Sequence, residues 1–83
     1  MAEITYYVAM PFLRDESGVL IAGNAEECQS STTALRRAEM MSRLAGNTGA
    51  IAFSRSGDPM MGEFKDAHLL RSFGQVLEDL GEL

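Results

Sequence analysis

The residue types that usually carry chemistry are scarce in this chain. Its 83 residues include one Cys, one His and no Trp, and no glycine-rich phosphate loop lies between a predicted strand and a predicted helix. One chain with so few candidates does not supply a nucleophile, a base and a group that orients the base. We therefore predict no catalytic residues, no cofactor or cofactor-binding residues and no metal ligands, and we do not expect an enzyme.

Disulfides, export signals and membrane spans are also missing. The lone Cys28 cannot form an internal disulfide. The first residues lack the basic start and the sustained apolar run of a secretory signal, and no stretch approaches the roughly 20 apolar residues of a membrane-spanning helix. We expect a cytoplasmic protein that makes no contact with the membrane.

Basic residues are too few to favour nucleic acid as a partner. Seven Lys and Arg stand against twelve Asp and Glu, for a formal net charge of −5. Binding to a phosphate backbone depends largely on Lys and Arg that displace condensed counterions. Three of the basic residues fall in one predicted helix, where we interpret them as a solvated face: Arg36, Arg37 and Arg43.

The apolar content is sufficient for one small core. Hydrophobic residues make up 46% of the chain and charged residues 23%, which is ordinary for a globular protein. A chain of this length forms one domain. We predict a single α+β domain over residues 1–83, with a disordered tail as one reading of residues 75–83.

Two strands are predicted before the helix. Residues 4–13 alternate with period two, and their larger apolar side chains share one face: Ile4, Tyr6, Val8, Met10 and Phe12. Pro11 places this strand at a sheet edge or marks its frayed end. A polar turn at residues 14–18 leads into a short strand at 19–22, which forms a hairpin with the first. Residues 23–29 are predicted as an irregular acidic crossover.

A helix is predicted from the Ser and Thr cluster at residues 30–33, which offers N-cap side chains, to about Ala45. Gly46 and Asn47 tolerate left-handed conformations that end a helix. Small residues dominate its apolar stripe and allow a close approach to a sheet: Ala34, Ala38, Met41 and Ala45.

A third strand is predicted at residues 49–55, followed by a loop at 56–62. Residues 63–73 fit a helix with Leu70, Phe73, Leu77 and Leu80 at helical spacing, or a strand that returns from the loop; periodicity alone does not decide.

A resemblance bears on this segment. The run GAIAFSRSGDP at residues 49–59, then Gly62-Glu63-Phe64 and Phe73-Gly74, resembles a family of short uncharacterised alphaproteobacterial proteins. The resemblance implies a strand at residues 68–70 and brings no function with it. The chain departs from the family pattern in its tail, which has Leu77 and no Pro. We therefore predict an antiparallel four-stranded sheet with one covering helix, in the order ββαββ; the alternative, ββαβα, ends in a second helix.

Two groups of residues are candidates for function. The first is a polar cluster near the end of the third strand, which could hold a small anion or could simply form a turn capped by Asp58: Ser54, Arg55, Ser56 and Asp58. The second is apolar, because Met60 and Met61 occupy a predicted loop while Met40 and Leu44 lie off the main helix stripe. The loop methionines could also fold back on the core.

These observations predict a small non-enzymatic protein that works by protein–protein contact, as a homodimer or a subunit of an assembly. A sheet with one helix leaves its second face and its edges available to another chain. On the first strand, we expect that second face to carry Tyr7, Ala9 and Leu13. The alternative is a small-molecule or anion-binding module that uses Arg55 and the Gly57-Asp58 loop.

Overall fold

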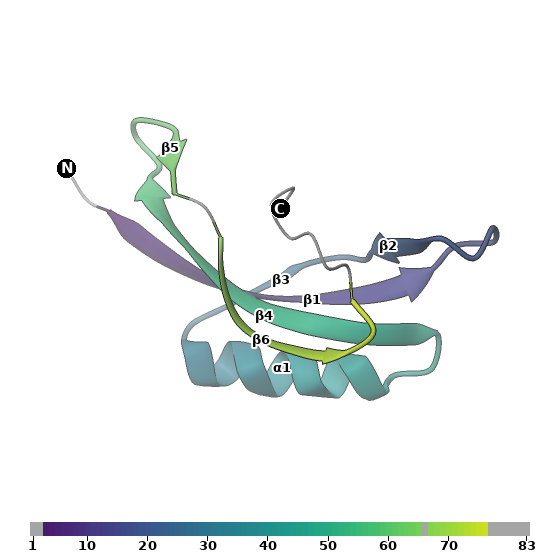
Figure 1. Cartoon of the computed structure of the whole chain (residues 1–83). Coiled ribbons are helices and arrows are strands. Elements are labelled where there is room, and N and C mark those ends of the chain that lie inside the picture. Colours follow the sequence, from purple (N-terminus) through teal and green to yellow (C-terminus); the bar gives the residue numbers. More distant parts are fainter. Residues whose placement is uncertain (1–2, 66, 77–83) are drawn as a thin grey trace.

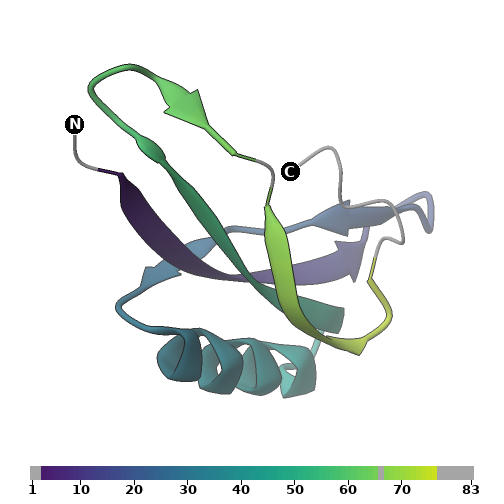
Figure 2. The same cartoon turned by 60° about the vertical axis from the view of Figure 1, so that its left-hand side comes forward.

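One helix packs on a curled antiparallel sheet (Figures 1 and 2). The computed structural model describes residues 3–65 and 67–76. In chain order the elements are β1 (Ile4–Arg14), β2 (Leu20–Ala22), β3 (Glu26–Cys28), α1 (Ser31–Arg43), β4 (Asn47–Asp58), β5 (Glu63–Phe64) and β6 (His68–Gly74). The predicted α+β class and the antiparallel sheet with a covering helix are confirmed, but within the described residues the sheet has six strands, not four.

The sheet has four strand positions, of which both outer ones are interrupted. The long strands β1 and β4 pair in the centre, from Ile4 opposite Gly57 to Leu13 opposite Asn47. Strands β2 and β3 both pair with β1, and β5 and β6 both pair with β4. The prediction that residues 23–29 are irregular is wrong at β3, which pairs with β1 through three residues.

Pro11 lies inside the central strand β1, so both of its predicted placements are wrong. It pairs with Ala50 on the β4 side, and its carbonyl accepts a 2.8 Å hydrogen bond from the amide of Gly23 on the other side. The N–H and C=O of a strand residue point to the same neighbour. The missing N–H therefore faces the gap between Ala22 and Glu26, where the outer strand is broken and no ladder bond is needed.

Helix α1 is closed at both ends by side chains. The Ser30 hydroxyl accepts a hydrogen bond of 3.2 Å from the amide of Thr33, which satisfies one free N–H of the first turn. The Asn47 side chain donates to the carbonyl of Met41 at 2.8 Å. Gly46 has a left-handed φ of 93°, as predicted, but Asn47 does not, and the helix ends at Arg43 rather than Ala45.

The helix covers the face of the sheet that carries small side chains. Its predicted stripe residues Ala34, Ala38 and Met41 are buried, whereas Ala45 lies beyond the helix and is exposed. The three buried residues pack with Ala9 of β1 and with Ala50 and Ala52 of β4. Tyr7 and Ala9 therefore face the helix, and the prediction that they lie on the uncovered side is wrong.

The opposite face of the sheet holds a second core. It consists of four buried residues of β1 and β4, with partly buried apolar residues packed around them: Met10, Phe12, Ile51 and Phe53, then Val8, Leu20, Ala67 and Val76. The expectation of a fully exposed second face is therefore wrong for this part of the sheet. We call the side of the sheet away from α1 the open face.

The described part of residues 63–73 contains strands β5 and β6 and no helix. Strand β6 has seven residues, of which six pair with β4, with a register shift between Ala52 and Phe53, as the strand alternative predicts. Among the described residues α1 is the one helix. The predicted positions Leu77 and Leu80, and all of the predicted tail after residue 76, lie outside the described residues.

Ala38→Leu is expected to destabilise the protein by about 1–3 kcal/mol, because a larger side chain must enter a helix–sheet contact built of small residues. Ala38 has no exposed surface and packs among other alanines. Urea denaturation of this variant and of Arg36→Leu, at an exposed position of the same helix, measures the difference. Equal midpoints for the two variants would contradict the observed helix orientation.

Candidate functional site: an apolar pocket beside the β4–β5 hairpin

The open face is hollowed next to the β4–β5 hairpin. A pocket of about 450 Å³ lies there, and four strands and the loop before β3 contribute to its lining: Tyr6 and Val8 from β1, Ala25, Glu27 from β3, Phe53 and Arg55 from β4, and Phe64 from β5. This volume is in the range of pockets that hold small ligands or the side chains of a partner. Most of the lining residues are apolar, so burying a complementary apolar group there would be favourable.

A pair of aromatic rings forms one wall of the pocket. The ring centroids of Tyr6 and Phe64 are 6.0 Å apart and the ring planes are tilted by 47°, which is a favourable aromatic geometry. Gly57 pairs with Phe64 and leaves room for it, because a Cβ on Gly57 would lie 2.5 Å from Cδ1 of the Phe64 ring. The absence of a side chain at Gly57 thus allows β5 to approach β4.

Among the described lining residues, Glu27 and Arg55 carry charge. Glu27 belongs to β3 and Arg55 to β4, on either side of β1, so the two charges come from opposite walls. Of the four predicted anion-site residues, Arg55 alone lines the pocket.

The predicted anion cluster is divided between the two faces of the sheet. Successive side chains of β4 point to opposite sides, so Ser54 and Ser56 lie on the face away from the pocket. The hydroxyl of Ser56 shares a 2.8 Å hydrogen bond with that of Thr5, while Ser54 pairs with His68 and Tyr7. The cluster therefore does not form one site.

Asp58 shapes the hairpin turn, as the structural alternative in the sequence predicts. Its carboxylate accepts a 2.9 Å hydrogen bond from the amide of Met60, and its carbonyl accepts from the amides of Met61 and Gly62. Gly62 takes a left-handed φ of 70° that completes the turn.

The turn carries the most exposed large apolar side chains that the structure describes. Met60 is 89% exposed and Met61 68%, so the loop methionines do not fold back on the core. We call these two residues the tip. The turn projects from the end of the sheet, on the side away from α1 (Figures 1 and 2).

The two helix residues of the predicted interaction surface lie apart from the tip. Met40 and Leu44 are about half exposed, at 53% and 55%. They belong to α1 and its C-cap, at the far side of the sheet from the β4–β5 turn (Figure 2). The four residues therefore form two separate patches.

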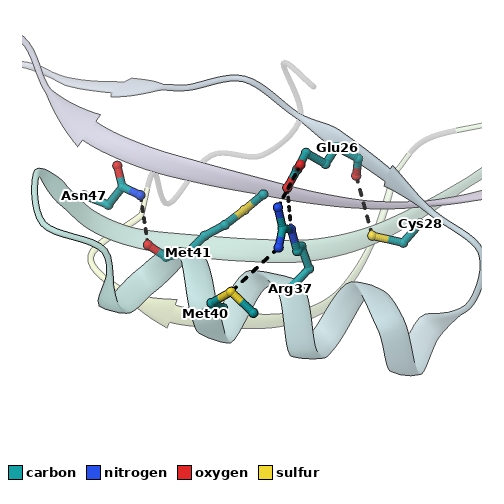
Figure 3. A network of polar contacts seen from close by, with 6 residues as sticks. All are labelled: Glu26, Cys28, Arg37, Met40, Met41 and Asn47. Carbon is teal, nitrogen blue, oxygen red and sulfur yellow. Dashed lines mark hydrogen bonds and ion pairs between the residues drawn. The ribbon is translucent and has the colours of Figure 1, made fainter.

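A polar network ties α1 to β3 (Figure 3). Arg37 donates to both carboxylate oxygens of Glu26, at 2.6 and 3.1 Å, and to the sulfur of Met40 at 3.7 Å. The hydrogen bond from Arg37 lowers the pKa of the Glu26 carboxyl below its ordinary value. The stabilisation from this exposed pair is therefore present at neutral pH and is lost as the pH falls through that lowered pKa.

Cys28 lies next to this network and has a raised thiol pKa. Burial is the main cause and the Glu26 carboxylate adds to it. The thiol donates to the carbonyl of Glu26 at 3.8 Å. Both effects keep Cys28 protonated and poorly nucleophilic at neutral pH.

Alkylation of Cys28 by iodoacetamide is expected to reach half of its maximum rate at a higher pH in the folded protein than in urea. Glu26→Gln should move that midpoint down, because it removes the carboxylate and leaves the Arg37 cation in place. Mass spectrometry of pH-quenched samples gives the rates. A folded midpoint at or below the urea value would contradict the assigned environment.

Comparisons extend neither the site nor the family assignment. No protein-family model, curated protein or solved structure matches this chain, so the resemblance to short alphaproteobacterial proteins stays a prediction. Within residues 3–65 and 67–76, no three His, Cys, Asp or Glu side chains gather as metal ligands do, and no helix has the length and apolarity to span a bilayer.

Proposed function

We propose that this chain works through protein–protein contact, in the first place with a second copy of itself, and not by catalysis. The observation that carries the proposal is the exposed tip beside an apolar pocket. The two belong to the same end of the sheet, because Phe64 of the hairpin is part of the pocket wall. Contact with another chain would remove both apolar surfaces from water.

The chemistry of the tip suits an interface. Methionine is unbranched and adapts its shape to a partner surface, and interface centres are enriched in methionine and aromatic residues. The described part of the chain supplies both types at this end: Met60, Met61, Tyr6 and Phe64. Single exposed apolar residues are common, but an exposed pair next to an apolar pocket indicates a contact surface.

Sedimentation velocity across a dilution series tests the proposal. We expect a mass that rises from monomer toward dimer with concentration. Met40→Ser should show the same concentration dependence as the wild-type protein, since it removes an exposed methionine from α1 rather than from the hairpin. A mass that stays at the monomer value at every concentration would overturn self-association.

A second candidate is the binding of a small apolar ligand that carries an acidic group. The pocket volume favours it, together with the presence of Arg55 in a mostly apolar lining. Arg55→Ala should then abolish ligand-dependent chemical shift changes and leave a hydrophobic interface intact. If a panel of aromatic and aliphatic carboxylic acids produced no shift changes in the wild-type protein, this candidate would fail.

A further inference from the structure

We propose that two copies of this chain exchange their hairpin tips, so that Met60 and Met61 of each copy enter the pocket of the other. This inference rests on the proposed self-association and names the surfaces that carry it. The tip supplies two flexible apolar side chains, and the pocket supplies about 450 Å³ lined largely by apolar groups. A pocket and a projecting turn at the same end of one sheet form a self-complementary patch, which a two-fold axis can close.

The charges at the two surfaces complement each other. The tip lies between Asp58, the last residue of β4, and Glu63, the first residue of β5. Insertion of the tip therefore brings two carboxylates toward a pocket whose lining contains Arg55. An approach along the β4 and β5 wall would place them nearer Arg55 of β4 than Glu27 of β3. Attraction to Arg55 would oppose the repulsion between two chains that each carry a net charge of −5.

Area considerations favour a mutual exchange over a single insertion. A stable interface buries about 800 Å² on each partner, which is about one seventh of the 5705 Å² surface of this chain. One methionine pair in one pocket does not reach that area. A two-fold arrangement doubles the contact and also brings the facing rims together, where Ile4 and Phe64 are partly exposed.

Complementation between two variants tests the exchange. The tip variant is Met60→Asp with Met61→Asp, and the pocket variant is Val8→Phe, which fills part of the pocket. Each should lower the dimer association constant at least about tenfold. An equimolar mixture should form heterodimer more strongly than either variant forms homodimer, and more weakly than the wild-type protein dimerises, because one of the two tip–pocket contacts is intact in the heterodimer. Met40→Asp should leave the dimer unchanged, and circular dichroism confirms that each variant folds.

The outcomes separate the inference from the function on which it rests. A wild-type protein that is monomeric at all concentrations defeats the proposed self-association itself. A wild-type dimer that persists in the tip variant, or in a folded pocket variant, leaves self-association standing and overturns the exchange. If the mixture associates no more strongly than either variant alone, the exchange is overturned as well. Should Val8→Phe fail to fold, Tyr6→Ala serves as the pocket variant.

Discussion

Phe12→Ala is expected to remove a large part of the folding stability of this protein. Phe12 has no exposed surface and lies in the core on the open face, among Met10, Ile51 and Phe53. Removing a buried phenyl ring costs about 3–5 kcal/mol, because the transfer energy is lost and a cavity remains. A domain of 83 residues is stable by about 4–12 kcal/mol in total. The variant should therefore lose about a quarter or more of its folding stability.

Phe64→Ala is the matched control for this loss. It deletes the same atoms at a position that is 47% exposed, where little cavity is created. Urea denaturation followed by circular dichroism gives both free energies of unfolding on a two-state basis. If Phe12→Ala costs no more than Phe64→Ala, the open face holds no second core.

The sequence alone did not predict which face of the sheet the helix covers. The alternation in residues 4–13 correctly separates two faces, with Val8, Met10 and Phe12 on one and Tyr7 and Ala9 on the other. Hydrophobicity alone suggests that the helix covers the larger side chains. The helix instead covers the small ones, because alanines on both surfaces allow the close approach that its own alanine stripe requires. The larger residues then pack together on the open face.

Local sequence signals predicted the helix and the turns better than the short outer strands of the sheet. The N-cap at Ser30, the left-handed Gly46 and the turn at Asp58 are encoded within a few residues, and the structure contains each of them. Strands β3 and β5 have three and two residues. Segments this short carry no periodicity, and they pair only because the long central strands present a free edge.

The sequence does not predict the pocket, for a related reason. Its lining comes from four strands and the loop before β3, so no local spacing marks it. Arg55 was identified, but with Ser54 and Ser56, although alternation along a strand sends neighbours to opposite faces. The sequence places Gly57 in a predicted loop, whereas the structure places it in β4 opposite Phe64. A glycine in a strand often marks a close approach of another backbone.

Gly49→Ala is expected to cost about 3 kcal/mol or more, which is the upper end of the range for overpacked cores. Gly49 is buried in β4 and pairs with Gly74 at the end of β6. A methyl group there would lie 2.5 Å from the carbonyl oxygen of Gln75 and 2.7 Å from its amide nitrogen, and closer still to the Phe73 carbonyl oxygen. These are backbone atoms, so no side-chain rotation can relieve the overlap.

The same region is held by hydrogen bonds that the methyl group would strain. The amide of Gln75 donates to the carbonyl of Thr48 at 2.9 Å, and the Thr48 hydroxyl donates to the carbonyl of Gln75 at 3.0 Å. To accept alanine, the end of β6 must move away from β4 and give up these bonds. Hydrogen exchange should therefore show β6 amides losing protection before those of β1.

Gly18→Ala separates this overlap from the ordinary effect of replacing a glycine. Gly18 has a φ of 82°, and a Cβ there meets no atom within 4 Å. Its replacement carries only the left-handed backbone penalty of roughly 1–2 kcal/mol, whereas Gly49 has no such φ and carries only the overlap. A larger loss at Gly49 than at Gly18, together with selective exchange in β6, would show that close backbone contact fixes the outer strand. Equal losses, or uniform exchange across the sheet, would contradict that contact.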